Sequence, residues 1–190
     1  MLLVEDQEKL IRLETLFARL FRDDEKTVLV RAATVDPVYY PRSEAHPLAE
    51  IHFANNFFSS ALHEIAHWLI AGSERRTKLD YGYWYKPDGR DQEEQQHFER
   101  FEARNQGLEW ILSSAANHDF HVSSDNLSGD SSDSSGFARC VKENALSLLQ
   151  KGFSGRSKTL IDALIAEFGD KEKFSKYWNL IEKGDILPPY

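Results

Sequence analysis

Cysteine is almost absent from the 190-residue sequence: Cys140 is the only one, so no disulfide can form within the chain. Because the sequence also lacks closely spaced cysteines and histidines, a zinc finger is excluded. A metal ion would therefore have to be held by histidine and carboxylate side chains. For Cys140 itself we expect a buried position, in which the thiol packs as a small apolar group.

The sequence also lacks long hydrophobic runs and an excess of positive charge. No run approaches the roughly 20 apolar residues that cross a bilayer, and Met1–Asp6 lacks the basic start of a secretory signal. We therefore expect a cytoplasmic protein with no membrane association. The 23 lysines and arginines against 31 aspartates and glutamates give a formal net charge of −8. This charge disfavours direct binding to nucleic acid and favours a cationic partner.

The length and a hydrophobic content of 41% are typical of a globular protein with one domain over residues 1–190. Apolar residues at helical spacing predict a first helix that ends near residues 23–24. Short β-prone runs predict strands at 27–30, 35–40 and 50–53. Further helices are expected from 56–60 to Gly72, then at 91–117, 138–150, 157–168 and 171–182. The predicted fold is α+β, a small sheet packed by several helices.

The stretch from Ala61 to Ala71 is apolar except for His63, Glu64 and His67. Residues four apart lie one turn apart on the same face of a helix, so the two imidazoles can bind one divalent ion. A helix that is apolar on all other sides is typical of a buried helix. Its polar residues need partners, because burying an unpaired ionisable group is costly. The pattern predicts a metal site on a buried helix, and the alternative is a polar pair within the core.

Two histidines do not complete a metal site, and the usual third protein ligand is a carboxylate, for zinc as well as for non-haem iron. The helix predicted at 91–117 offers Glu99, Glu102 and Glu109. At 100° per residue, Glu99 falls opposite the apolar stripe, whereas Glu102 and Glu109 flank it. This stripe consists of Phe98, Phe101, Leu108, Ile111 and Leu112. Glu102 is the preferred third ligand, with Glu109 and Glu99 as alternatives.

Further segments form a recognisable set with the histidine motif. They are His63-Glu64-Ile65-Ala66-His67-Trp68 with Ile70-Ala71-Gly72, Gly82-Tyr83-Trp84-Tyr85, Pro87-Asp88-Gly89-Arg90-Asp91, Phe98-Glu99, Glu102, Gln106, Leu108, Trp110, Asp125-Asn126-Leu127 and Gly129-Asp130. In these segments, which span roughly Pro37 to Asp130, the chain resembles the bacterial elongation factor P hydroxylase family. The combination is far more specific than the five-residue motif alone.

The resemblance implies an iron-dependent monooxygenase that uses dioxygen to hydroxylate the β-lysyl-modified lysine of elongation factor P, a step that supports translation. It also implies an α+β fold similar to a family of metal-binding ribosomal-RNA endoribonucleases. In this interpretation Fe(II) is held by His63, His67 and Glu102, which leave about three positions of an octahedral ion open. An acidic channel with aromatic walls would suit the dicationic substrate side chain. The nearest candidates for such a channel are Tyr83, Asp88, Asp91 and Asp125.

Two other functions are compatible with the motif. In a zinc-dependent hydrolase, the same three ligands would hold the ion and Glu64 would be the general base that activates the metal-bound water. In an oxygenase, Glu64 can instead ligate, orient a ligand or pair with the substrate ammonium. The third possibility is a non-enzymatic binding module with a structural metal. The sequence has no recognisable 2-oxoglutarate or flavin signature, so the electron donor stays open, as do the methylene attacked and the oligomeric state.

Overall fold

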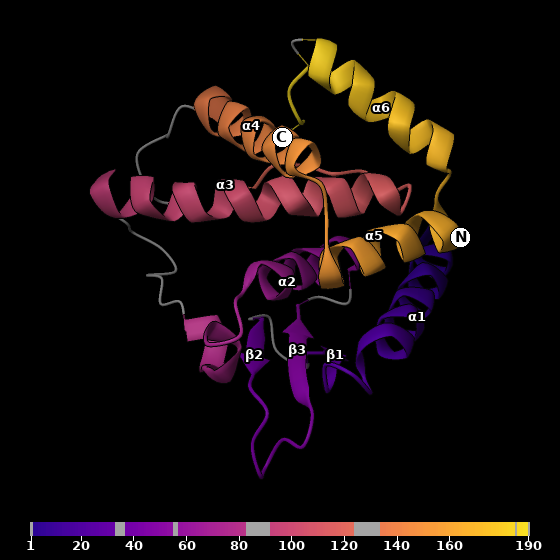
Figure 1. Ribbon diagram of the computed structural model, residues 1–190, viewed down its shortest axis with the longest axis vertical. Helices are drawn as coiled ribbons and strands as arrows, with labels where there is room; N and C mark the ends of the chain where they lie inside the picture. The colour runs from indigo at the N-terminus through magenta and orange to yellow at the C-terminus, as the bar shows by residue number, and fades with distance from the viewer. Residues whose placement is uncertain are drawn as a thin grey trace. The chain divides into compact units, whose positions relative to one another are not determined.

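The computed structural model describes residues 2–32, 37–54, 57–82, 92–123, 134–184 and 186–189 (Figure 1). The chain forms two compact units, Met1–Tyr83 and Trp84–Tyr190. In its described residues, the first unit combines helices with a small sheet, and the second is helical. The predicted α+β class is therefore confirmed, while the single-domain organisation stays a prediction.

The first unit is built on a three-stranded sheet of β1 (Thr27–Arg31), β2 (Val38–Tyr40) and β3 (Ala49–Phe53), in the order β1-β3-β2. The central strand β3 pairs parallel with β1 and antiparallel with β2. Along β3, three buried residues alternate with the half-buried Glu50 and His52. This alternation is what a sheet with one face on the core requires. The three strands were predicted to within a few residues, and part of the second, residues 35–36, lies outside the described residues.

A side chain satisfies part of the outer edge of β2. The backbone amide of Tyr39 donates a hydrogen bond to Oδ1 of Asp80 at 3.1 Å, and the Tyr39 hydroxyl donates to the carbonyl of Arg76 at 3.0 Å. Asp80 lies in the short 3-10 helix Leu79–Gly82 and has a φ of 49°, a conformation that aspartate tolerates better than most residues. An edge strand exposes unpaired backbone groups, and Asp80 binds one of them.

Two helices supply the apolar core of the first unit. α1 (Leu2–Phe21) contacts β1, and α2 (Phe58–Ile70) contacts β3. The rings of Phe17 and Phe21 meet Trp68 edge to face, with centroids 5.3 Å and 5.0 Å apart. α2 begins after Phe57, whose side chain forms no capping hydrogen bond. Burial of its apolar faces stabilises the helix instead.

The second unit is organised around α3 (Gln92–Ala115). This helix contacts α4 (Ser134–Lys151), α5 (Gly155–Phe168) and α6 (Lys171–Lys183) (Figure 1). Every residue of α3 from Asn105 to Ser113 is buried. At Gly107, a Cβ atom would lie 2.9 Å from the backbone nitrogen of Ala145 and 3.1 Å from the carbonyl oxygen of Val141. The lack of a side chain at Gly107 therefore allows α3 and α4 to approach closely.

Two residues of the second unit differ from their expected burial. Phe101, expected in the buried stripe of α3, is 37% exposed, and the adjacent Arg100 is exposed as well, whereas Glu102 and Ala103 are buried. Cys140 is exposed on α4, although partial desolvation and the nearby Glu143 and Glu99 raise the pKa of its thiol. Among the residues described, no helix has the length and apolar character to cross a membrane.

Candidate metal centre and family

The two histidines of the motif lie one turn apart on α2. Their ring centroids are 4.9 Å apart with an interplanar angle of 77°, and both side chains are half-buried, as is Glu64. The buried residues of α2 occupy its other faces and are Phe58, Ala61, Leu62, Ile65, Ala66, Trp68 and Leu69. Packing of these apolar faces within the first unit fixes the helix and leaves His63, Glu64 and His67 on the partly covered side.

Buried polar side chains form a stripe along α3. Glu102 is 3% exposed, Glu109 is 8% exposed, and Asn105 and Gln106 are buried between them. At 100° per residue these four residues share one side of the helix. A carboxylate buried to this extent needs a cation or hydrogen-bond donors. Glu99 differs from the others because it is half-buried.

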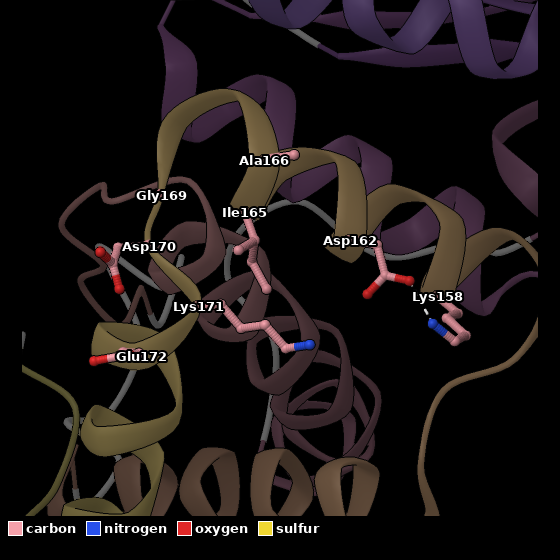
Figure 2. Close-up of a pocket in the computed structure, with 8 residues that line it drawn as sticks. All are labelled: Lys158, Asp162, Ile165, Ala166, Gly169, Asp170, Lys171 and Glu172. Atoms are coloured by element: carbon pink, nitrogen blue, oxygen red, sulfur yellow. Dashed lines mark hydrogen bonds and ion pairs between the residues drawn. The ribbon is translucent and has the colours of Figure 1, made fainter.

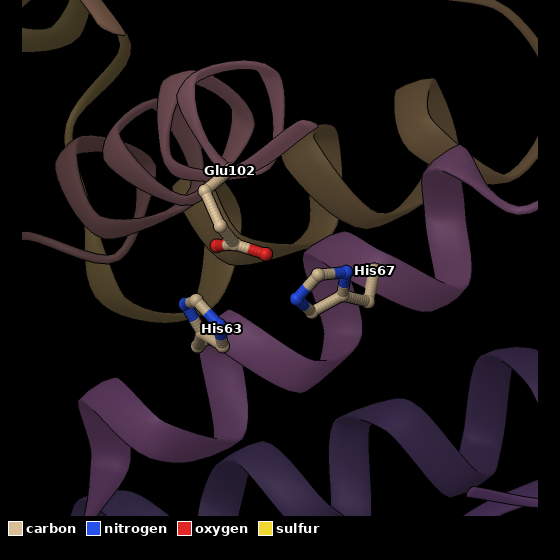
Figure 3. Close-up of side chains that lie close together, drawn as sticks. All are labelled: His63, His67 and Glu102. Carbon is tan, nitrogen blue, oxygen red and sulfur yellow. The ribbon is translucent and has the colours of Figure 1, made fainter. Parts of the chain in front are cut away.

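Figure 3 shows the side chains of His63, His67 and Glu102. One ligand atom from each residue lies within 4.8 Å of those of the other two. Ligand atoms about 2.1 Å from one ion are separated by roughly 3–4 Å, so small side-chain rotations would bring the three into range. Two imidazoles and one carboxylate are the donor set of catalytic zinc and non-haem iron sites, and the residues present fit such an ion. Glu109 and Glu64, which the structure also describes, do not belong to this cluster.

The residues predicted to line a substrate channel are Tyr83, Asp88, Asp91 and Asp125, and all four lie outside the described residues. His118 and His121 belong to the described part of the second unit. They line a hollow next to Trp110 and are not members of the metal-ligand cluster.

One buried residue of α3 received no role from the sequence. The side-chain amide of Gln106 donates to the carbonyl of Ser123 at 2.6 Å, and its oxygen accepts from the amide of Ser123 at 3.1 Å. Gln106 lies one turn after Glu102, so the helix that carries the candidate ligand also holds the chain that follows it. The available signal was an amide side chain four residues after the preferred ligand Glu102.

Comparison with known proteins identifies relatives over most of the chain. The family model for elongation factor P hydroxylase (EpmC) matches residues 16–177. An elongation factor P lysine hydroxylase from Haemophilus influenzae is 42% identical over 166 residues, which cover 87% of this chain and 93% of that protein. The chain belongs to the elongation factor P hydroxylase family. The resemblance inferred from the sequence motifs is thus confirmed, and the family match extends beyond Pro37–Asp130 in both directions.

Proposed function

We propose that this protein hydroxylates the β-lysylated lysine of elongation factor P with an Fe(II) ion held by His63, His67 and Glu102. The observation that carries the proposal is the donor set of the cluster, two imidazoles and one carboxylate, in a member of this family. When bound, Fe(II) supplies the activation of dioxygen that places one oxygen atom on a side-chain carbon. The activity belongs in the cytoplasm, where translation factors act.

The side chains of the cluster have distinct tasks. His63 and His67 would each bind the ion through one ring nitrogen, and their partial exposure gives an ion a path to them. Glu102 is almost fully buried, so solvent and salt screen its attraction to a cation less than at the surface. Three protein ligands leave the remaining coordination positions to small ligands.

The substrate side chain carries two positive charges, and acidic residues are its natural partners. Glu64 lies on the same partly covered side of α2 as the histidines without belonging to the ligand cluster. Its task is to pair with a substrate ammonium rather than to activate water, because the family match favours a hydroxylase over a hydrolase. Tyr83, Asp88, Asp91 and Asp125 stay predicted members of this substrate channel.

The test is to incubate the iron-loaded protein with a reductant, dioxygen and β-lysylated elongation factor P and to follow the intact mass of the substrate. We expect a gain of one oxygen atom that requires both dioxygen and Fe(II). Equal activity after replacement of the iron with zinc would contradict the iron assignment. No gain with the iron-loaded protein would contradict the proposed reaction.

Two buried carboxylates on the same side of α3 provide a matched pair for the ligand assignment. Glu102→Gln is expected to lose metal binding and activity, whereas Glu109→Gln is expected to keep both. Circular dichroism would first show that both variants remain folded. If Glu109→Gln lost metal binding and activity while Glu102→Gln kept both, the wrong carboxylate would have been assigned.

A further inference from the structure

The second unit contains a hollow of about 870 Å³ between α6 and the chain that follows α3. Beneath it lie two almost completely buried rings, those of Trp110 and Phe120, and the more exposed ring of Tyr177. The rings of Trp110 and Phe120 are stacked with centroids 5.8 Å apart, and Nε1 of Trp110 donates to the Tyr177 hydroxyl at 2.9 Å. Concave sites lined by aromatic side chains with a few polar groups are where proteins commonly bind partners or ligands.

Hydrogen bonds fix the wall of the hollow opposite α6. The amide of His118 donates to the carbonyl of Ser113 at 2.9 Å, and the amide of Val122 donates to the carbonyl of Pro189 at 2.7 Å. The paired bonds between Gln106 and Ser123 hold the end of this wall. Because the wall is anchored at several points, a partner that binds there has little chain to order.

The rim on the α6 side combines apolar and positively charged side chains. Lys173, Lys176, Tyr177 and Leu180 recur at spacings of three and four, so they share one face of the helix and line the hollow. Tyr177 is 38% exposed and Leu180 is 63% exposed. Exposed apolar side chains gathered beside a hollow mark an interaction surface more often than isolated ones do.

The charge on this rim favours an acidic partner. α6 carries four lysines and two glutamates, although the chain as a whole has a net charge of −8. Lys176 lies 3.8 Å from Glu172, and this largely exposed pair contributes little, so Lys176 can pair with a carboxylate of a partner instead. The carboxylate of Asp170 is already used, because it accepts from the amide of Lys173 and caps α6. Burial raises the pKa of the Tyr177 hydroxyl, and Asp119, which also lines the hollow, lies close enough to raise it further. Asp119 would therefore direct an acidic side chain away from itself and toward Lys173 and Lys176.

A second hollow, at the junction of α5 and α6, lacks these properties. Figure 2 shows that Lys158 and Asp162 at its edge pair with each other and that Asp170, the cap of α6, lies at its other end. Its lining residues include no aromatic side chain. Because the lining of this second hollow offers no aromatic side chain, the aromatic hollow beside Trp110 is the stronger candidate.

We propose that the aromatic hollow docks an acidic segment of elongation factor P, with an apolar side chain against Tyr177 and Leu180 and a carboxylate facing Lys173 and Lys176. The inference rests on the proposed function. An enzyme that modifies one side chain of a folded protein needs contacts away from the reacting atoms to hold that protein. Aromatic and lysine side chains at a preformed hollow supply such contacts, with the apolar anchor at the centre and the charges at the edge.

The test compares the kinetics of hydroxylation in variants of α6. Lys176→Glu and Leu180→Ala are expected to raise the KM for β-lysylated elongation factor P about tenfold and to change kcat less than about twofold. Lys183→Glu is the matched control, since it makes the same charge change on the same helix outside the hollow, and its KM should stay near that of the parent protein. Both replaced side chains at the hollow are exposed, so thermal melting should show unchanged folding.

The outcomes separate the docking proposal from the proposed function. An active parent protein with an unchanged KM in Lys176→Glu and Leu180→Ala would overturn docking and leave the function intact. An equal rise in KM for Lys183→Glu would also overturn it, because the effect would then come from overall charge. If sedimentation showed self-association that Leu180→Ala abolishes, the occupant would be a second copy of the chain and the proposal would be wrong. A parent protein that is inactive with iron would instead contradict the function.

Discussion

Replacing Gly107 with alanine tests whether α3 and α4 pack as closely as the structure shows. In an open helix this substitution would be favourable by about 0.5–1 kcal/mol, because alanine is the better helix former. Here the new methyl group would lie 2.9 Å from the nitrogen of Ala145 and 3.1 Å from the oxygen of Val141. Both are backbone atoms, so a helix has to shift, and such overpacking costs about 1–3 kcal/mol. The expected net effect is a loss of about 1 kcal/mol.

Urea denaturation of the two proteins measures this difference directly. For a chain of this size, 1 kcal/mol corresponds to a fall in Tm of about 2–4 °C. Gly72→Ala is the control, because a Cβ at Gly72 meets no atom within 4 Å, and its stability should stay close to that of the parent protein. A Gly107→Ala variant that is more stable than the parent would refute the close approach, since helix propensity would then outweigh the contact.

Three further predictions concern buried polar groups and the metal. Gln106→Leu removes both bonds to Ser123 and should lower the free energy of unfolding by about 1–3 kcal/mol in urea titrations; an unchanged value would mean that water replaces the amide. A divalent ion at a hundred times its Kd should stabilise the protein by about 2.7 kcal/mol, which corresponds to a rise in Tm of about 5–10 °C. The His67→Ala variant should show no such rise, and an equal rise in that variant would mean that the ion binds elsewhere. The pKa of Glu50 is lowered from its usual 4.5, mainly by the hydrogen bond with His52. The ionised Glu50 therefore stabilises the fold above pH 4.5, and this stabilisation is lost as the pH falls through the lower pKa of the folded state. The difference in stability between the parent protein and Glu50→Gln should therefore shrink on acidification, and a constant difference would show that the carboxylate charge is not involved.

Helices with a regular pattern of apolar residues were predictable from the sequence. The helical spacing of apolar residues predicted the first helix, and Leu10, Leu13 and Phe17 of α1 are fully buried. The apolar surround of the two histidines likewise predicted that α2 is packed on its other faces. In both helices the sequence pattern and the observed burial agree, because the helical period alone determines which side chains face the core.

The long helix α3 was harder to interpret, because both its apolar and its polar residues are buried. Glu102 and Glu109 flank the same stripe and are both nearly inaccessible, so helical geometry alone could not choose between them. Phe101 fits the stripe by angle but stays partly exposed, since an angle does not tell where along the axis the neighbouring helices begin. The role of Gln106 depends on Ser123, seventeen residues away, and such a contact leaves no periodic trace in the sequence.

The hydrogen bond from Tyr39 to Asp80 has a consequence for the behaviour of this protein in concentrated solution. An edge strand with unpaired backbone groups can pair with the same strand of another molecule and start irreversible aggregation. The carboxylate of Asp80, a residue with a positive φ that few residues tolerate, occupies one backbone amide of β2 and so hinders this pairing. Loss of this single side chain would leave the fold in place but shorten the time for which the protein can be stored without precipitating.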